Sequence, residues 1–505
     1  MSGAKAPERR AAEDSMSGAK APERRAAEDT MSEWEMVIGL EVHCELRTDT
    51  KLFCGCRNAF GDEPNTNVCP VCLGLPGSLP VINERAVEYA MRIGAALHCD
   101  IRRSIFHRKN YFYPDMPKDY QISQYDEPLN VDGHLELPDG ASVGIERAHM
   151  EEDTGKSQHV GSSGRIHGAD HSLVDYNRAG VPLVEIVSRP DLRSAEAARA
   201  YVAELRSILV ATGASDGKME EGSLRVDANV SVHRRGEPFG TRCEVKNLNS
   251  LRSLGRAIDY EARRQIALLE GGDRVVQETR HWNEDEGRTS TMRSKEEAYD
   301  YRYFPEPDLV PLDPSNEWQA AVRAALPELP AERRHALATV GNVAPSDVAL
   351  IVELDLDPLV TRAIQAGAEP RIAINRAANE LAGSLDAASR LDAGAFATVC
   401  SMEASGRLTP TQAKQVLAEL LASGGDPVAI ADARGFAPVE AGVVESAVDA
   451  AIADDPAAWA RYVGGEDKVA GLFVGKVMKA TGGKADGKAV TAALQGRRLA
   501  APSSS

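Results

Sequence analysis

The amino-acid sequence predicts an α+β protein in which an open, mixed sheet shaped as a cradle is followed by all-helical domains. Between residues 37 and 247, short segments alternate apolar and polar residues at the two-residue period of a strand. From residue 331 onward the chain is rich in Ala and Leu at helical spacing, with capping residues such as Ser346 and Asp347. A chain of 505 residues is also too long for one hydrophobic core.

The expected domain boundaries follow changes in composition. Within residues 1–30, Met1–Asp14 recurs as Met16–Asp29, without apolar periodicity and without a secretory apolar region. We interpret this duplicated segment as a disordered leader or as an artefact of the start site or of cloning. Three folded domains are then expected, namely a catalytic cradle domain at 31–312, a helical linker domain at 325–395 and a helical tail domain at 396–505.

Composition excludes several classes of protein. The apolar content is 43%, and no apolar run approaches the roughly eighteen residues that a membrane span needs. The formal net charge of −18 argues against nucleic-acid binding through the field of the whole molecule, while leaving room for a local basic surface. Eight cysteines without a signal peptide indicate a reducing cytoplasm, in which clustered cysteines indicate a metal site before disulfides.

The first predicted strand, Val37–Glu45, has two unlike faces. One face is apolar and the other carries Glu41, His43 and Glu45. Carboxylate and imidazole groups on one rigid face suit a divalent cation or a phosphoryl-transfer site. A sheet edge with a solvated face is the alternative for this segment taken alone.

Two further segments place carboxylates where they need partners. Glu151 and Glu152 belong to a run of three consecutive carboxylates, which is either held by positive charge or forms a solvated acidic turn. Glu185 lies at the centre of the apolar strand Leu183–Val187, where a carboxylate is seldom buried without a cation.

A predicted hairpin supplies the fourth polar face. Its first strand, Arg225–His233, carries Asp227 and Asn229, and its return strand carries Lys246. Glu220 and Glu221 lie just upstream. The hairpin would hold metal-bound phosphates or form an amphipathic meander. Because the sequence contains no phosphate-binding loop motif and no dinucleotide fingerprint, we expect any nucleotide to be held through carboxylate-bound Mg²⁺.

The cysteines of one short insert have the spacing of a zinc site. A C-x-C pair and a C-x-x-C pair are separated by twelve residues, and the four thiols are those of Cys54, Cys56, Cys69 and Cys72. A site with four sulfur ligands has no open position, so its zinc would be structural. Free thiols are the alternative.

Two segments are candidates for RNA contact. Phe106–Tyr120 interleaves basic and aromatic residues, which suits stacking on single-stranded RNA and equally suits a rigid loop at the mouth of a site. Between residues 468 and 498, seven basic residues face one acidic residue, which gives a local charge of +6. This tail fits tRNA phosphates or an ordinary solvated helix face, and its lysines are Lys468, Lys476, Lys479, Lys484 and Lys488.

Six short segments occur in a fixed order along the chain, namely Val37–His43, Cys69–Gly77, Lys109–Pro114, His149–Asp153, Lys218–Arg225 and Tyr301–Asp308. Together, in this order, they resemble the B-subunit family of the glutamine-dependent aspartyl/glutamyl-tRNA amidotransferases. The resemblance covers residues 33–498.

This resemblance implies a cradle distantly similar to the glutamine synthetase core. It also implies an ATP- and Mg²⁺-dependent ligase that phosphorylates the side-chain carboxylate of Asp-tRNA(Asn) or Glu-tRNA(Gln) and amidates it with ammonia. The ammonia would come from an amidase (A) subunit, and a small C subunit would complete a heterotrimer. The sequence does not say which of the two tRNAs is used. The rival hypotheses are a small-molecule carboxylate–ammonia ligase and an RNA-binding subunit without catalysis.

The resemblance also implies roles for individual residues. Mg²⁺ would lie on Glu41, His43, Glu152 and Glu185, with Glu151 as the neighbouring candidate. Lys109 and Lys118 would line the path of ammonia, a role that requires transient neutrality. The residues implied on the nucleotide side are Glu220, Glu221, Asp227, Asn229 and Lys246.

Overall fold

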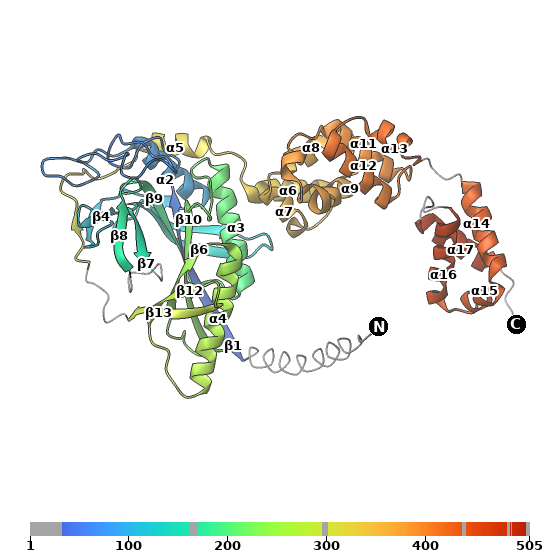
Figure 1. The fold of residues 1–505 in the computed structure, drawn as a ribbon, viewed down its shortest axis with the longest axis horizontal. Coiled ribbons are helices and arrows are strands. Elements are labelled where there is room, and N and C mark those ends of the chain that lie inside the picture. The colour runs from blue at the N-terminus through green and yellow to red at the C-terminus, as the bar shows by residue number, and fades with distance from the viewer. Residues whose placement is uncertain are drawn as a thin grey trace, which may run out of the picture. The chain divides into compact units, whose positions relative to one another are not determined.

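The computed structural model describes residues 33–161, 169–294, 301–436, 441–481, 485 and 487–500 (Figure 1). The chain divides into two compact units, Met1–Ala331 and Glu332–Ser505. The first unit is built on a large mixed sheet and the second is helical, so the predicted α+β class is confirmed. The duplicated leader at residues 1–30 lies outside the described residues.

The first unit contains a 12-stranded sheet. β11 and β12 run parallel, and the other strand pairs of this sheet are antiparallel. In sheet order the strands are β13 (Arg288–Ser294), β12 (Glu278–Asn283), β11 (Cys243–Leu248), β10 (Leu224–Arg234), β1 (Trp34–Glu45), β9 (Pro182–Ser188), β6 (Ser142–Glu152), β4 (Tyr120–Ser123), β3 (His107–Asn110) and β14 (Phe304–Pro305), with β5 (Asn130–Glu136) paired to β6 and β2 (Asp100–Ile101) paired to β5. A separate hairpin joins β7 (Lys156–Gly161) to β8 (Ala169–Asp175).

β1 lies in the interior of the sheet and is hydrogen-bonded to β10 on one edge and to β9 on the other. Its register places Glu41 opposite Asp227 of β10 and His43 opposite Glu185 of β9. Since opposed residues of antiparallel strands point to the same face, the polar residues of the three strands gather on one side of the sheet.

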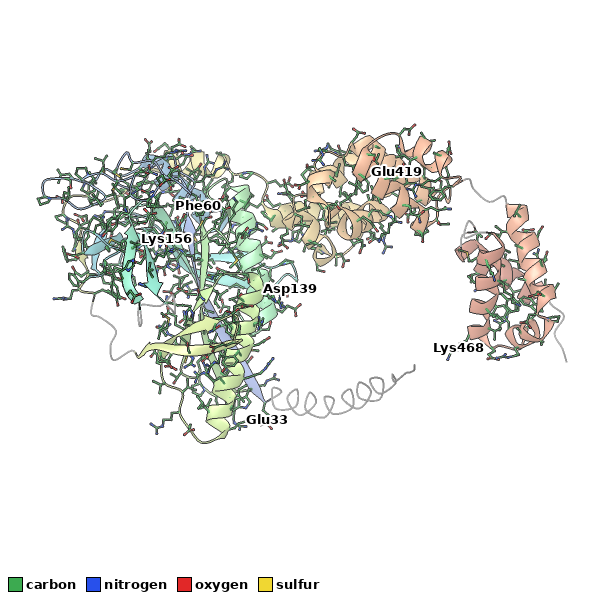
Figure 2. The ribbon with its side chains drawn as sticks, viewed as in Figure 1. Glu33, Phe60, Asp139, Lys156, Glu419 and Lys468 are labelled. Carbon is green, nitrogen blue, oxygen red and sulfur yellow. The ribbon has the colours of Figure 1, made fainter. Side chains whose placement is uncertain are left out.

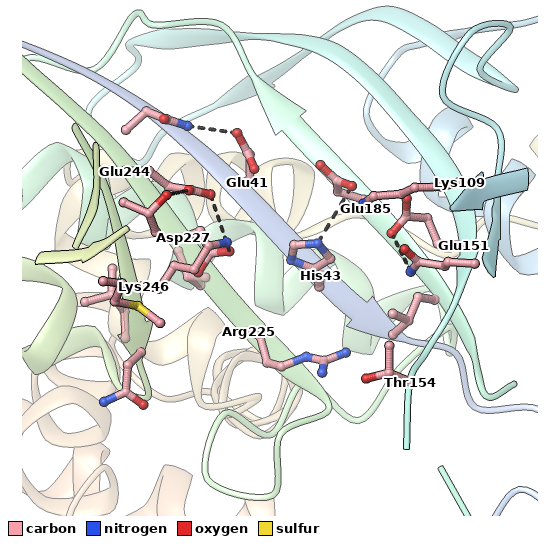
Figure 3. Close-up of a pocket in the computed structure, with 18 of the residues that line it drawn as sticks. Glu41, His43, Lys109, Glu151, Thr154, Glu185, Arg225, Asp227, Glu244 and Lys246 are labelled. Carbon is pink, nitrogen blue, oxygen red and sulfur yellow. Dashed lines mark hydrogen bonds and ion pairs between the residues drawn. The ribbon is translucent and has the colours of Figure 1, made fainter. Parts of the chain in front are cut away.

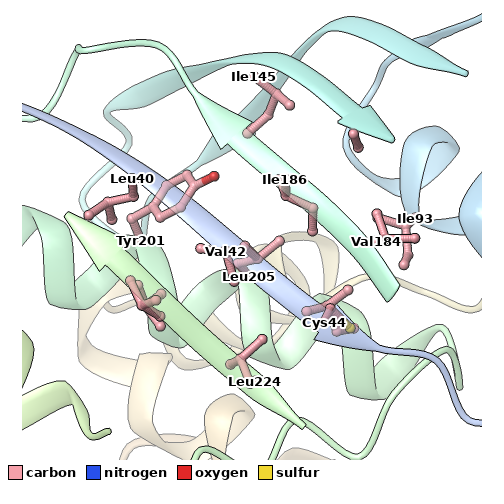
Figure 4. Packing of buried hydrophobic residues seen from close by; sticks show 14 of the residues in the cluster. Leu40, Val42, Cys44, Ile93, Ile145, Val184, Ile186, Tyr201, Leu205 and Leu224 are labelled. Carbon is pink, nitrogen blue, oxygen red and sulfur yellow. The ribbon is translucent and has the colours of Figure 1, made fainter. Parts of the chain in front are cut away.

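Helices cover the apolar face of the sheet. They are α2 (Glu84–Ala96), α3 (Ala195–Ala211) and α4 (Leu251–Glu270), and the shorter α5 (Asn316–Ala324) packs against α2. The N-caps of α2, α3 and α4 are Asn83, Ser194 and Ser250, whose side chains accept backbone N–H groups of the first turn. Leu40 and Val42 of β1 pack with Tyr201 and Leu205 of α3 in the main core (Figure 4).

The second unit contains two hydrophobic cores. One core runs from Leu337 to Ala431 and the other from Val444 to Leu494. The helices around the first core are α6 (Pro330–Gly341), η2 (Pro345–Val348), α7 (Ala349–Glu353), α8 (Asp357–Gln365), α9 (Pro370–Arg376), η3 (Ala377–Leu381), α10 (Leu385–Ala388), α11 (Ala393–Ala404), α12 (Pro410–Ser423) and α13 (Pro427–Ala433). Those around the second core are α14 (Ala441–Asp454), α15 (Pro456–Val463), η4 (Asp467–Val469), α16 (Ala470–Ala480) and α17 (Gly487–Ala500).

The expected boundary between linker and tail, at residues 395 and 396, lies inside α11 and inside the first of these cores. The first core ends at Ala431 and the second begins at Val444, so the division between them lies between these two residues. Pro, Gly and capping residues precede nearly every helix of this unit, so composition does not show which loop separates two cores.

Among the described helices, none is by itself long and apolar enough to span a membrane. Two neighbouring helical segments, Pro330–Gly341 and Pro345–Glu353, pass this test of length and composition only when they are taken together, and their axes are bent by 107° relative to each other.

We predict that Gly94→Ala destabilises the first unit although Ala is the better helix former. A Cβ atom at Gly94 of α2 would collide with the side chain of Asn130, which is buried and fixed by donating to the carbonyls of Ala90 (3.1 Å) and Ala148 (2.9 Å). We expect the free energy of unfolding to fall by about 1–3 kcal/mol, measured by urea denaturation. The control is Gly475→Ala in α16, where no atom lies within 4 Å of the added Cβ and stability should rise by up to about 1 kcal/mol. A gain in both variants would contradict the proposed packing.

Candidate active site

The polar face of the sheet forms the floor of a cavity of about 890 Å³. Carboxylates from six strands (β1, β6, β9, β10, β11 and β12) line it together with two lysines, Lys109 of β3 and Lys246 of β11, and Figure 3 shows most of these side chains. The charged and polar lining includes Glu41, His43, Lys109, Glu151, Asp153, Glu185, Arg225, Asp227, Asn229, Glu244 and Lys246.

One cluster of ligand-type groups lies near the middle of the cavity. A ligand atom from each of His43, Glu151 and Glu185 lies within 4.8 Å of the others. Behind them, the buried His149 places its Nε2 atom 3.4 Å from a carboxylate oxygen of Glu151 and 3.4 Å from one of Glu185. Gln121 donates to Glu151 at 3.2 Å. These contacts hold the two carboxylates in position for a cation.

A second cluster lies toward β10 and β11 and consists of Glu41, Asp227 and Glu244, again with ligand atoms within 4.8 Å of one another. Lys246 lies between two of them, with its Nζ atom 2.6 Å from Asp227 and 2.8 Å from Glu244. Asn229 donates to Glu41 at 2.8 Å. One lysine therefore offsets part of the negative charge of these three carboxylates, and their oxygen atoms are ligands of the type that Mg²⁺ prefers.

Burial and mutual repulsion set the charges of these groups. Burial, with the nearby carboxylates Glu185 and Glu244, raises the pKa of Glu41. Burial acts against ionisation of Glu151 as well, but the hydrogen bond from His149 and the charge of Lys109 hold its pKa well below the usual range. A cation bound between the clusters would relieve the repulsion at Glu41.

Both lysines of the cavity are charged. Burial alone would lower their pKa values, but Glu151 raises that of Lys109, and Asp227 with Glu244 raises that of Lys246. For Lys109 this direction is opposite to the neutrality expected of a lysine that passes ammonia. The structure thus places Lys109 at the cavity as a cation that balances Glu151.

Glu152 and Lys118 do not belong to this cavity. Because side chains alternate along a strand, Glu152 points away from the face that carries Glu151, and its carboxylate is paired with Lys118 and accepts the backbone N–H of Ile122 at 2.9 Å. The pair lines a second cavity of about 330 Å³, beside Cys54 and Cys72. In this geometry Glu151, rather than Glu152, lies beside His43 and Glu185.

Glu220 and Glu221 also lie away from the cavity. They are exposed in the turn before β10, where Lys218 pairs with Glu221 at 2.8 Å. The sequence groups them with Asp227 because the three residues are close along the chain. Glu220 and Glu221 belong to the turn that precedes β10, however, and this turn lies outside the lining of the cavity.

Sequence reasoning missed several lining residues. Glu244 lies on the predicted return strand two residues before Lys246, so the sequence places it on the same face but assigns it no role there. Asp153 and Arg225 form an ion pair of 2.7 Å that no local pattern indicates, because 72 residues separate them. Tyr125 and Arg147 also line the cavity, and neither belongs to a motif of the sequence.

Comparison with known proteins identifies the family. Residues 36–320 match the model of the GatB/GatE catalytic domain, and residues 359–497 match that of the GatB domain. The B subunit of the aspartyl/glutamyl-tRNA(Asn/Gln) amidotransferase from Frankia casuarinae is 53% identical over 477 residues, which cover 91% of this chain and 94% of that protein. The chain belongs to this B-subunit family. Proteins of the same name from Salinispora tropica (52% identity; 91% of this chain and 95% of that protein) and Streptomyces coelicolor (50%; 90% and 94%) are similar along the same length. The family predicted from the six sequence segments is confirmed.

In this member of the B-subunit family, the four predicted zinc ligands lie together. The Sγ atoms of Cys54, Cys56, Cys69 and Cys72 are within 4.8 Å of one another, and those of Cys69 and Cys72 are 3.9 Å apart. Tetrahedral zinc with bonds of ~2.3 Å needs sulfur separations of about 3.8 Å. The Cys69 N–H also donates to the Cys72 Sγ atom at 3.1 Å. The cluster is compatible with zinc.

The basic tail is less positive in the fold than along the chain. Lys476 pairs with Asp454 at 2.7 Å, and both arginines of α17 pair with aspartates of other segments. Lys468 (Figure 2) and Lys479 are exposed and form no ion pair with another described residue. Lys484 and the Lys488 side chain lie outside the described part.

We predict that Cys69→Ser removes zinc from the purified chain. Loss of one sulfur ligand leaves a weaker site, so zinc measured by mass spectrometry should fall from about one ion per chain to near zero. Cys400→Ser, which changes a buried thiol of the helical unit, should retain the metal. A Cys69→Ser variant that retains one zinc per chain would exclude the four-cysteine site.

Proposed function

We propose that this chain carries the ATP-dependent step of amide formation on misacylated tRNA. It phosphorylates the side-chain carboxylate of Asp on tRNA(Asn) or of Glu on tRNA(Gln) and then replaces the phosphate with ammonia, which makes it a carbon–nitrogen ligase. The observation that carries the proposal is the pair of acid clusters in one lysine-bearing cavity, in a chain whose relatives are named for this amidotransferase.

The chemistry explains why ATP is needed. A free carboxylate is a poor electrophile, because ammonia would have to expel an oxide. In the first step a carboxylate oxygen attacks the γ-phosphorus, the bond to the β–γ bridging oxygen breaks, and ADP leaves. In the second step ammonia attacks the acyl carbon, phosphate leaves with the bonding electrons, and the nitrogen loses a proton.

The two clusters divide this work. We assign Mg²⁺ to His43, Glu151 and Glu185, and the metal-bound triphosphate to the side of Glu41, Asp227 and Glu244. When bound, Mg²⁺ neutralises the charges of phosphate and carboxylate as they approach. Lys246 exchanges its carboxylate partners for phosphate oxygens, and Asn229 keeps Glu41 oriented. Lys109 compensates Glu151 and attracts the anionic side chain of the substrate.

We assign the second cavity to the arrival of ammonia. Lys118 and Glu152 line it. Gln121 lines the main cavity, and its side-chain amide donates both to the Glu151 carboxylate (3.2 Å) and to the backbone carbonyl of Glu152 (2.8 Å), the residue whose side chain lines the second cavity. A hydrogen-bonding path of this kind suits a small polar molecule. The nitrogen would then reach the acyl phosphate from the side of β4.

The remaining assignments concern partners and location. We propose that an amidase A subunit supplies ammonia from glutamine, that a small C subunit completes the heterotrimer, and that the tail domain holds tRNA phosphates through Lys468 and Lys479. The cysteine cluster would hold a structural zinc. All eight cysteines are unpaired thiols, which is typical of the cytoplasm.

The main prediction concerns Glu151. With the partner subunits, ATP, Mg²⁺ and ammonium chloride, the wild-type chain should form Asn or Gln on the corresponding misacylated tRNA. Glu151→Gln should lower this rate about 100-fold or more, because a ligand of the cation loses its charge, while the glutaminase activity of the partner stays. Glu237→Gln, an exposed change in the turn between β10 and β11, is the matched control.

The same assay separates the rival functions. ATP turnover on free aspartate or glutamate would indicate a small-molecule ligase, and undiminished amidation by Glu151→Gln would place the chemistry on another chain.

A second prediction concerns the path of ammonia. Lys118→Met and Glu152→Gln should each reduce glutamine-dependent amidation about tenfold more than amidation with external ammonium chloride, which enters the open cavity directly from solvent. Circular dichroism and thermal melting identify a variant that fails to fold. Equal losses with both nitrogen sources would contradict the assignment of the second cavity.

A further inference from the structure

Aromatic side chains are concentrated at one end of the main cavity. The rings of Tyr125 and Tyr303 stack with centroids 4.8 Å apart and planes at 17°, and Tyr301 meets Tyr303 edge-on at 6.3 Å. The guanidinium carbon of Arg147 lies 5.4 Å from the Tyr125 ring centroid, and Lys109 Nζ lies 4.9 Å from that of Tyr301. All five side chains line the cavity that contains the acid clusters.

This aromatic group is open to a ligand. Although it is stacked, Tyr125 keeps 49% of its surface exposed. Arg147 pairs with Glu146 through its Nη1 atom at 2.7 Å, and its buried Nε atom has no hydrogen-bond partner among the described residues. A half-exposed tyrosine ring beside a partly exposed arginine plane and a cationic lysine is the kind of surface on which an unpaired nucleobase stacks.

The order of the strands separates this group from the proposed nucleotide side. Asp227 and Lys246 belong to β10 and β11, whereas Lys109 and Arg147 belong to β3 and β6. β1 and β9, with the cluster at His43, lie between them. In phosphoryl transfer the attacking and leaving oxygens lie on opposite sides of the phosphorus. If the triphosphate approaches from β10 and β11, the acceptor carboxylate approaches from the aromatic end.

That carboxylate is joined through an ester to the terminal ribose of the tRNA, whose base is an adenine. We infer that Tyr125, Tyr303 and Arg147 form a subsite for the 3′-terminal adenine of the aminoacyl-tRNA. The inference rests on the proposed function and adds to it the residues that position the reacting end of the RNA. The adenine of ATP has the same stacking chemistry, so the test distinguishes the two sources.

The test uses the complete amidotransferase with Tyr125→Leu, which removes the ring, and Tyr125→Phe, which keeps it. Binding is measured first, with an acceptor-stem RNA that ends in adenosine and with one that lacks its terminal base. We expect Tyr125→Leu to weaken binding of the intact RNA about tenfold. We expect Tyr125→Phe to bind like the wild type and Tyr125→Leu to have no effect on the RNA without the base. Wild type and Tyr125→Leu, each measured with both RNAs, form a double-mutant cycle that gives the interaction energy between the Tyr125 ring and the terminal base.

Kinetics with ammonium chloride then identify which adenine is bound. The inference predicts that Tyr125→Leu raises KM for aminoacyl-tRNA and leaves KM for ATP unchanged. A rise in KM for ATP alone would assign the subsite to the nucleotide and overturn the inference, as would equal weakening of the RNAs with and without the terminal base. Absence of amidation by the wild-type complex would instead refute the proposed function, and the binding cycle would still decide the subsite.

Discussion

The site depends on the position of β1 in the interior of the sheet. Hydrogen bonding on both edges fixes its register twice, so Glu41 is held opposite Asp227 and His43 opposite Glu185. The apolar residues of the same strand are packed under α3, and a slip of one residue would expose them. Burial of the core and alignment of the polar face are therefore enforced by the same pairing.

Such a face concentrates negative charge, and the fold compensates it locally. Lys246 lies in one acid cluster, Lys109 faces the other, and Arg225 neutralises Asp153 beside them. These cations, supplied by the chain itself, offset part of the repulsion among the carboxylates. Under the proposed function, Lys246 would exchange its carboxylate partners for phosphate oxygens, and Lys109 would face the carboxylate of the substrate.

The general architecture could be predicted from sequence because alternation and helical spacing are local signals. The same alternation found the polar faces of β1 and β10, and the spacing of cysteines found their cluster. The alternation of residues did not decide whether Glu151 or Glu152 faces the main cavity, because three consecutive acidic residues at the end of β6 hide which positions of the strand point to which face. Arg147 and Tyr125 could not be found, because they come together only through the order of strands. The local charge of the tail is overestimated from sequence because its partners, such as Asp454, precede it in the chain.

Glu151 and Glu152 are consecutive residues, yet each faces a different cavity. At this point the wall between the two cavities is a single peptide unit of β6. The two carboxylates are bonded to the same stretch of backbone, which solvent ions cannot enter to screen them from each other. A change of charge at Glu152 therefore acts electrostatically on Glu151 across a very short separation. Under the proposed function, ammonia would arrive on one side of this peptide unit and the substrate would be activated on the other, so the two steps would share one short stretch of β6.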